Sequence, residues 1–432
     1  MSSGFGTLEP LLAPRSVAVV GASDREGNLG GLAVGFLAKF GYRGPVWAVN
    51  PSGGTVRGQR AYANLRDLPG VPDLAIVAVP AGGVASVVRD CADVGTPAAI
   101  AWAGGFAEIG PEGATRQREL EALCRDTGVK LCGPNCIGVI NTSIGLTASF
   151  SSMLADNATL TPGTVSMVSQ SGGIGVMSHA RAQAFGLGFR ITVSCGNEAS
   201  VTLPDVMRAL VDDDGTRVVA VYVEGLSDPD GFVEALAAAR RRDKPVVVMK
   251  GGASEASGRA ALAHTGRLAG SDRIFDAIFR EFAVSRVGSA EELLDVALQL
   301  ASTRPEQMPQ GRRVLVSTFG GGSGVVCTDQ CAREGLLVPA LSSHTRERVA
   351  PLCTPLSSVA NPVDFTPGMV TDARHREKLP QALEALADAP DVDGWVFLAA
   401  GFAKQADELA VAFDAIRNRS TKPICLSWQA MP

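Results

Sequence analysis

Short apolar runs rich in valine alternate with helical patterns along almost the whole chain, and this alternation restricts the possible folds more than any other feature. Two examples are "SVAVVGAS" (16–23) and "LAIVAVP" (74–80), whose near-continuous apolar character predicts strands buried on both faces. Strands of this kind, separated by helices, form parallel sheets with helices on both sides. The sequence therefore predicts an α/β fold.

Three sets of these strands follow one another, and the first ends near residue 145, where a polar stretch begins. The second and third sets open with "TVSMVSQSGGIG" (164–175) and "VLVSTFGGGSGVV" (314–326). Each opening is a strand, then small residues and glycines, then a helix, which indicates a divergent domain duplication. A chain of 432 residues is also too long for one core. We predict domains over 1–145, 146–302 and 303–432, with a linker near the start of the third.

The charge pattern argues against two classes of partner. The formal net charge is −5, without a basic tract or an arginine-rich arm, so we expect neither a nucleic acid nor a membrane as partner. No apolar run reaches the roughly 18 residues that span a bilayer. The N-terminus lacks the pattern of a signal peptide, so we expect a cytoplasmic protein.

Nine cysteines raise the question of a metal site or of disulfides. Cys132 with Cys136, and Cys327 with Cys331, have spacings that resemble half of a metal site. However, the first pair flanks "GPN", and the second lies on a predicted helix without a histidine nearby. Because zinc needs a full tetrahedral ligand set, we expect no metal site and interpret these residues as buried, reduced thiols.

Gly21, Ala22 and Ser23 follow the first predicted strand, at a turn that leads into a helix. Glycines at such a turn let the backbone approach a phosphate, and the helix N-terminus adds partial positive charge. A dinucleotide fingerprint would also need an acidic residue after the second strand, where this chain has "VNPSGG" (49–54). The pattern favours a nucleotide-like ligand without a nicotinamide. The alternative is a glycine turn that binds no ligand.

A second candidate phosphate site begins the second domain and comprises Ser169, Gln170, Ser171, Gly172 and Gly173. Hydroxyl groups and backbone N–H groups at a helix start form a nest for an anion. The alternative is an ordinary helix cap, because serine caps many helices. Two serines followed by two glycines favour the phosphate site.

His264 lies in "ALAHTGRLAGSD" (261–272), among small residues that provide no core for its ring. A neutral histidine on a glycine-flanked loop offers a nucleophilic nitrogen near pH 7. Given an anion nest and a carboxylate for its other ring nitrogen, such a ring accepts a phosphoryl group. Glu224, at the end of "VVAVYVEG" (218–225), is the candidate carboxylate. The alternatives are an ordinary surface or core histidine and an ordinary acid at a strand end.

In this order, the motifs resemble those of the NDP-forming (ADP-forming) acyl-CoA synthetases, relatives of succinyl-CoA ligase. The resemblance covers nearly the whole chain and rests on "AVVGAS", "VNP", "VAVP", "GGFAE", "CGPNCIGVIN", "VSQSGG", "YVEG", "KGG", "AHTGRLAGSD" and "NPVDFTP". It implies a Rossmann-like CoA-binding domain, followed by two flavodoxin-like domains of the succinyl-CoA-ligase type.

The resemblance also implies a role for each candidate residue. His264 would be the phosphohistidine, Glu224 its supporting carboxylate, and residues 169–173 its phosphate cradle. The residues implied to bind coenzyme A are Gly21, Ala22, Ser23, Asn50, Pro51, Val79 and Pro80. Relatives often carry a lysine where this chain has Ser52, and Arg57 is the candidate to replace that cation.

The implied reaction converts a carboxylic acid, CoA and a nucleoside triphosphate into acyl-CoA, nucleoside diphosphate and phosphate, through an acyl phosphate and a phosphohistidine. It requires an ATP-grasp domain that binds ATP or GTP with Mg²⁺, and this sequence has no segment with that pattern. We therefore expect that domain on a partner subunit or in a longer polypeptide, and an oligomeric enzyme.

Two other functions stay open on the sequence. A non-enzymatic module that senses CoA or acyl-CoA would use the same pocket, although it would have no need of His264 and Glu224. An NAD-dependent oxidoreductase would share the fold of the first domain. The missing ribose acid and the lack of a hydride-transfer constellation argue against it.

Overall fold

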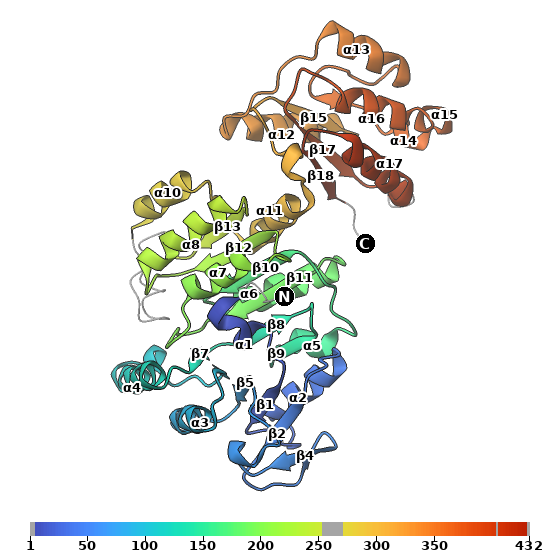
Figure 1. The fold of residues 1–432 in the computed structure, drawn as a ribbon. Helices are drawn as coiled ribbons and strands as arrows, with labels where there is room; N and C mark the ends of the chain where they lie inside the picture. Colours follow the sequence, from blue (N-terminus) through green and yellow to red (C-terminus); the bar gives the residue numbers. More distant parts are fainter. Residues whose placement is uncertain (1–4, 253–270, 403–404, 430–432) are drawn as a thin grey trace. The chain divides into compact units, whose positions relative to one another are not determined.

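The computed structural model describes residues 5–252, 271–402 and 405–429 (Figure 1). The chain divides into two compact units, Met1–Ala301 and Ser302–Pro432. This division lies within one residue of the predicted start of the third domain. Each unit is an α/β structure, as the apolar strand runs predicted.

The first unit begins with a seven-stranded sheet in the order β3-β4-β2-β1-β5-β6-β7. Its strands are β1 (Val17–Val20), β2 (Val46–Val49), β3 (Thr55–Val56), β4 (Gln59–Tyr62), β5 (Leu74–Val77), β6 (Ala98–Ala101) and β7 (Lys130–Cys132). All neighbours are parallel except the short pair β3 and β4. Helix α2 (Leu29–Lys39) packs on one face, and α3 (Ala81–Val94) and α4 (Pro111–Thr127) pack on the other (Figure 1).

Capping residues set where the helices of this domain begin and end. Asn28 caps α2, because its side-chain oxygen accepts the backbone N–H of Gly31 at 2.7 Å. Helices α3 and α4 both end at glycines in the left-handed region, Gly95 (φ 86°) and Gly128 (φ 77°). The turns that follow β1 and β5 lie at the same edge of the sheet, because these neighbouring strands are parallel.

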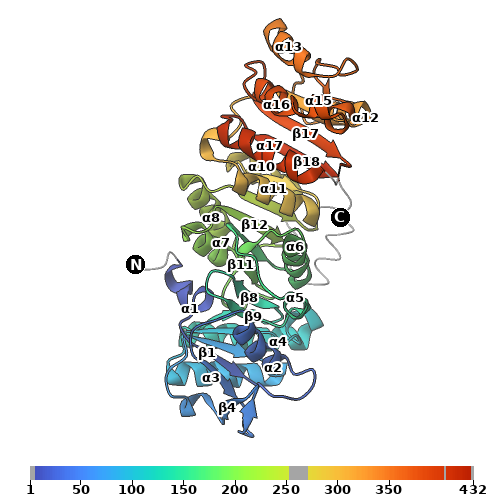
Figure 2. The ribbon, with the colours of Figure 1, turned by 90° about the vertical axis from the view of Figure 1, so that its right-hand side faces the viewer.

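The second sheet of this unit also has seven strands, in the order β14-β13-β12-β10-β11-β8-β9. They are β8 (Gly138–Asn141), β9 (Leu146–Ser149), β10 (Val165–Ser169), β11 (Phe189–Ser194), β12 (Val218–Val223), β13 (Val246–Lys250) and β14 (Ser285–Val287). Helices α7 (Leu203–Asp212) and α8 (Pro229–Arg241) cover one face, and α6 (Gly172–Ala184) and α11 (Ala290–Ser302) cover the other; Figure 2 shows α6 opposite α7 and α8. The five strands from β14 to β11 are parallel and have the flavodoxin-like order.

Strands β8 and β9 form an antiparallel hairpin that joins this sheet at β11. Asn141 of β8 pairs with Ile191 of β11. The predicted domain boundary at residue 145 therefore falls inside the hairpin, and the end of the first predicted domain contributes a strand to the second. The sheet is mixed rather than purely parallel.

The second unit contains a four-stranded parallel sheet in the order β16-β15-β17-β18. Its strands are β15 (Val314–Thr318), β16 (Val363–Asp364), β17 (Gly394–Ala400) and β18 (Ile424–Gln429). The helices of this unit are α12 (Gly321–Arg333), α13 (Ser343–Val349), α14 (Gly368–Thr371), α15 (Ala373–Arg376), α16 (Leu379–Ala387) and α17 (Ala406–Arg419). Its strand order matches that of β11, β10, β12 and β13, which agrees with the predicted duplication.

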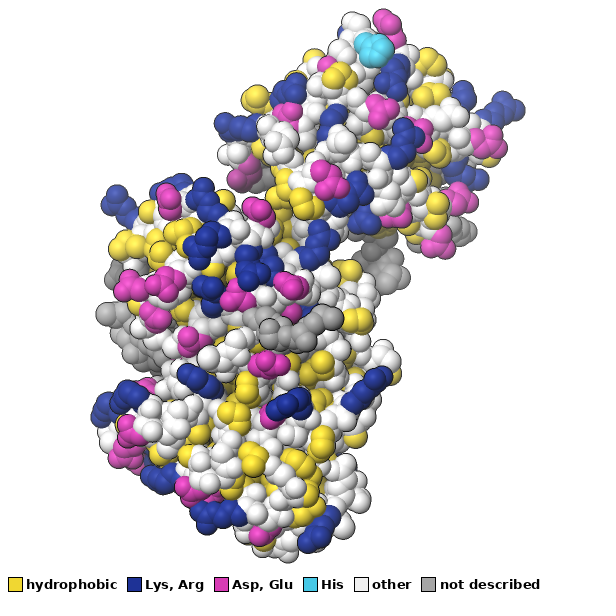
Figure 3. Space-filling view, viewed as in Figure 1, with side chains coloured by type: hydrophobic (Ala, Val, Ile, Leu, Met, Phe, Trp, Pro, Cys, Tyr) yellow, Lys and Arg dark blue, Asp and Glu magenta, His cyan; other side chains and the backbone are white. Residues whose placement is uncertain are grey.

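The described part of the first unit also contains three shorter or peripheral helices: α1 (Glu9–Leu12), α5 (Ser152–Asp156) and α10 (Asp272–Glu281). Acidic and basic side chains lie side by side over α7 and α8 (Figure 3), where Asp212 pairs with Arg208 at 2.8 Å and with Arg242 at 3.1 Å. Among the described residues, no helix combines the length and the apolar character that crossing a bilayer requires.

Candidate functional site

The residues predicted to bind CoA lie together at the carboxyl edge of the first sheet. Gly21 follows β1, Asn50 follows β2 and Val79 follows β5. The Asn50 side-chain amide donates to the backbone oxygen of Ala22 at 2.8 Å, which ties two of these turns together. Gly21 has a φ of +89°, and a Cβ there would lie 2.4 Å from the backbone oxygen of Ala78. Only glycine fits at this contact between neighbouring turns.

The turn at Ser23 is held by the cap of α2. The Asn28 side-chain oxygen accepts the backbone N–H of Ser23 at 3.0 Å, and its nitrogen donates to Gly21. A Cβ on Gly31 would lie 2.1 Å from the backbone oxygen of Ser23. The glycines of this segment therefore bring α2 against the turn, so close packing explains them as well as a phosphate does.

Pro51, Pro80 and Ser52 line the outer part of this edge. Pro51 and Ser52 are exposed, and Pro80 is the N-cap of α3. Arg57 crosses the first turn of α2, where its Nε donates to the backbone oxygen of Gly31 at 3.3 Å. The structure thus places a guanidinium group beside the turn, and its role as the replacement for a lysine at position 52 stays a prediction.

The second cluster lies where the strand order of the second sheet reverses. The chain passes from β10 to β11 on one side, and β12 lies on the other side of β10. Ligands of doubly wound folds bind at this kind of switch point. Residues 169–173 run from the last residue of β10 into α6, and Glu224 follows β12, so the structure brings the predicted cradle and the predicted carboxylate to one edge.

The helix start is polar and partly open. The Ser169 hydroxyl donates to the backbone oxygen of Ser171 at 2.5 Å, and the Ser171 side chain accepts the N–H of Ile174 at 3.4 Å. Gly172 packs closely on Ile137, since a Cβ there would come within 2.6 Å of it. Gly173 is exposed, so packing does not explain the second glycine.

Gln170 is predicted to bind phosphate, but both ends of its side-chain amide bind protein groups. Its oxygen accepts the backbone N–H of Glu224 at 2.6 Å and that of Gly225 at 3.2 Å. Its nitrogen donates to the backbone oxygen of Gly225 at 2.6 Å and to the carboxylate of Glu198 at 2.7 Å. The side chain fixes the end of β12.

Glu224 is 7% exposed, and its two carboxylate oxygens differ. Oε1 accepts the hydroxyl of Tyr222 at 3.0 Å, whereas Oε2 is buried and has no hydrogen-bond partner among the described residues. Burial, reinforced by the charge of Glu224, raises the pKa of Tyr222 well above its usual value, so the phenol stays a donor. Lys250 donates to the backbone oxygen of Glu224 at 3.0 Å, and burial lowers the pKa of Lys250.

Glu198 and Asn197 were not among the predicted site residues. Glu198 is 5% exposed and accepts the Ser227 hydroxyl at 2.7 Å in addition to Gln170. The Asn197 amide donates to Glu108 of the first domain at 2.6 Å. Burial alone raises the pKa of Glu108, but hydrogen bonds from Asn197 and from backbone N–H groups outweigh it and hold this pKa below its usual value. The motifs "GGFAE" and "SCGN" contain two of these residues, although neither motif indicates that they meet.

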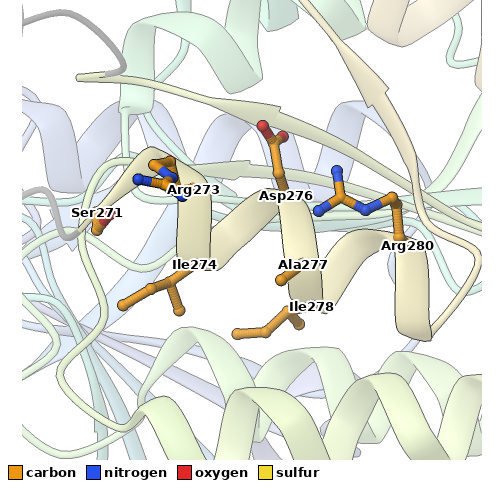
Figure 4. A pocket seen from close by; sticks show the side chains of 7 residues that line it. All are labelled: Ser271, Arg273, Ile274, Asp276, Ala277, Ile278 and Arg280. Atoms are coloured by element: carbon orange, nitrogen blue, oxygen red, sulfur yellow. The ribbon is translucent and has the colours of Figure 1, made fainter.

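His264 lies outside the described residues, so its predicted role remains a prediction. Across the part of the chain that is described, no group of three or more His, Cys, Asp or Glu side chains is arranged to hold a metal ion. An open pocket runs along α10, where Ile274 and Ile278 point to one side and Asp276 and Arg280 to the other (Figure 4). Of the predicted site residues that the structure describes, none lines it.

Family models match both domains of the first unit. Residues 15–142 match a CoA binding domain, and residues 162–300 match the succinyl-CoA ligase like flavodoxin domain. These matches confirm the fold predicted for the two domains. Oxidoreductase chemistry finds no support in either match.

Characterised relatives extend the match over most of the chain. The alpha subunit of acetate–CoA ligase [ADP-forming] II from Pyrococcus furiosus is 34% identical over 386 residues, which cover 89% of this chain and 81% of the relative. 4-Hydroxybutyrate–CoA ligase [ADP-forming] from Nitrosopumilus maritimus is 32% identical over 83% of this chain, which spans 50% of that longer protein.

A solved structure supports the matches to the family models and to the relatives. The dinucleotide forming acetyl-coenzyme A synthetase 1 of Ca. Korarchaeum cryptofilum, in complex with phosphate and ADP, superposes with a TM-score of 0.86 and 29% identity, covering 98% of this chain and 89% of that one. The family domains, the extent of the identity and the shared architecture lead to one conclusion: the chain belongs to the enzyme family of ADP-forming acyl-CoA ligases.

Proposed function

We propose that this chain is the CoA-binding and phosphohistidine part of an acyl-CoA synthetase that joins a small carboxylic acid to CoA. In this proposal the edge around Gly21 and Asn50 binds CoA. His264 carries the phosphoryl group, and the start of α6 at residues 171–173 holds the phosphate. Glu224 supports the histidine ring.

The observation that carries this proposal is the buried Oε2 of Glu224, which has no hydrogen-bond partner in the described parts of the chain. A buried acceptor without a donor is costly, and more so when it carries charge. Glu224 stands at the switch point beside the polar start of α6, where an imidazole N–H would satisfy it and a phosphoryl group would meet backbone N–H groups. A site that bound CoA alone would not need this acid.

The proposed steps begin with neutral His264. One ring nitrogen attacks the terminal phosphorus of the nucleoside triphosphate, so the N–P bond forms as the diphosphate leaves. The positively charged ring donates its other N–H to Glu224. A carboxylate oxygen of the acid then attacks the phosphorus, which breaks the N–P bond and yields an acyl phosphate and neutral histidine. Finally, the CoA sulfur attacks the carbonyl carbon, and phosphate leaves with the thiol proton.

The nucleotide step is assigned to an ATP-grasp domain that binds ATP or GTP with Mg²⁺ on a partner subunit or elsewhere in a longer polypeptide. The relative from Pyrococcus furiosus is named as an alpha subunit, which supports a separate partner and an oligomeric enzyme. The named substrates of relatives, acetate and 4-hydroxybutyrate, favour a small aliphatic acid. A cytoplasmic location is part of the same proposal.

The reverse reaction tests the proposal. The chain, with any ATP-grasp subunit that co-purifies, is incubated with labelled phosphate and a panel of acyl-CoAs that begins with acetyl-CoA. We expect protein-bound label that is lost in acid, kept in base and absent from His264→Asn. Tight CoA binding without label from any acyl-CoA would favour the sensing module instead.

A further inference from the structure

Glu198 is a buried carboxylate that the proposed steps do not use. It lies in the loop after β11, and its backbone has a φ of 54°, in the left-handed region that residues other than glycine rarely adopt. Such conformations persist where the surrounding structure holds them, and they cluster at functional sites. The position therefore needs an explanation beyond packing.

The carboxylate of Glu198 fixes the orientation of Gln170. Because a carboxylate only accepts hydrogen bonds, its 2.7 Å contact must come from the amide nitrogen of Gln170. The amide oxygen of Gln170 then faces the backbone N–H of Glu224, at 2.6 Å. Glu198 thus influences the end of β12 through two successive hydrogen bonds, one from Gln170 to Glu198 and one from Glu224 to Gln170.

The neighbouring residue connects the same loop to the first domain. Asn197 donates to Glu108 at 2.6 Å, and its backbone N–H donates to Pro134 at 2.8 Å. The loop is therefore anchored on the CoA-binding side, while Glu198 holds Gln170 on the other side. An anchored loop is a firm support for a side chain that positions another residue.

We propose that Glu198 is a positioning residue, which orients Glu224 through Gln170 for phosphoryl transfer. This inference rests on the proposed function. It assigns Glu198 the role of a hydrogen-bond acceptor and not that of a charge that meets the substrate. A glutamine at this position would keep the role, because its amide oxygen can accept from Gln170 while its nitrogen donates to Ser227.

The test measures the rate of labelling from acetyl-CoA and labelled phosphate in four proteins: the wild type, Glu198→Leu, Glu224→Gln and the double variant. We expect Glu198→Leu to lower the rate about 10-fold with an unchanged KM for acetyl-CoA. In the Glu224→Gln background the same change should lower the rate less than about 2-fold, because residues that act through one another are not additive. Glu198→Gln should label within about 3-fold of the wild type.

Several outcomes would overturn this assignment. Additive losses in the double variant would show that Glu198 acts independently of Glu224. Loss of labelling in Glu198→Gln as large as that in Glu198→Leu would indicate a role of its charge. If Glu198→Leu does not fold, Ser227→Ala, which removes one donor to Glu198, must show the same dependence on Glu224. A wild type without label would overturn the proposed function itself, and this inference with it.

Discussion

In both flavodoxin-like sheets, the first strand ends in a short turn that leads into a helix. Strand β10 continues through Gln170 into α6, and β15 continues through Phe319 into α12. Gln170 joins a network of hydrogen bonds with Glu198 and the end of β12. Phe319 instead packs in an aromatic core, with its ring 5.1 Å from that of Phe397.

The third strands of the two sheets, β12 and β17, also lead to different residue types at matching positions. Ser169 and Thr318, the last residues of the first strands, pair with Tyr222 and Leu398 respectively. Glu224 and Ala400 each lie two residues after these partners, so they occupy matching positions in the two sheets. One copy of the fold therefore has an acid where the other has alanine. The shared backbone provides an edge where a site can form, and the side chains on that edge decide whether it does.

The largest expected effect is on the aromatic core of the second unit. Phe319→Ala should lower the free energy of unfolding of that unit by about 3–5 kcal/mol, because it empties a buried site among aromatic rings. Hydrogen exchange of the β15 and β17 amides would measure it. Val325→Ala, at an exposed position of α12, should change the same exchange by less than about 0.5 kcal/mol. Similar effects of both variants would contradict the assigned core.

The polar edge of the first unit predicts an effect on chemistry instead. Glu224→Gln should lower the rate of histidine labelling at least about 100-fold, or about 2.7 kcal/mol, because a neutral amide does not stabilise a positively charged ring. Its melting temperature should stay near that of the wild type. Glu234→Gln, on the exposed side of α8, is the matched control and should label normally. Normal labelling of Glu224→Gln would remove this acid from the site.

The stabilities of the two units should also respond differently to acid. His179 of α6 is buried, and burial lowers its pKa to about 4 from 6.5. In this pH range the unfolded state binds a proton at His179 and the folded state does not, so the free energy of unfolding falls as the pH drops from 6.5 towards 4. Between pH 7 and pH 5 this amounts to about 2 kcal/mol for the first unit. His179→Gln should remove this pH dependence in urea unfolding, and His344→Gln, exposed in the second unit, should leave it unchanged.

The smallest effect concerns the helix caps. Ser171 caps α6 with its side chain, whereas Gly320 caps α12 without one. Ser171→Ala should cost about 1 kcal/mol. Gly320→Ser should gain a few tenths of a kcal/mol, since its φ of −155° suits any residue and a Cβ there meets open space. Thermal unfolding of each variant would measure both changes, and a loss of stability in Gly320→Ser would show that the glycine has another purpose.

The sequence predicted the layers well because buried parallel strands have a distinctive pattern. Runs such as Val17–Val20 and Leu74–Val77 are apolar at every position, and the structure buries all of them. The antiparallel hairpin of β8 and β9 was harder to predict, because strands of four residues carry no signal of direction. Its membership of the second sheet depends on a long-range pairing with β11.

The candidate site was predicted unevenly for a similar reason. Glu224 directly follows a clear strand, so the pattern predicted its place at a sheet edge. Glu198 lies in a loop, where an acidic residue is normally exposed, and nothing in the local sequence signals its burial. The glycines after β1 show the reverse problem, because the same residues suit a phosphate site and close packing. The distances in the folded chain add close packing as an explanation and leave the phosphate site as a prediction.

The shared hairpin has a consequence for dividing the chain. A cut at residue 145 would leave β8 without β9 and would remove β8 from β11. The exposed edge of β11 would then be free to pair with other molecules, which is a common route to aggregation. Chimaeras that exchange CoA-binding domains between relatives should therefore be joined after residue 149, so that the hairpin travels intact with the domain that precedes it.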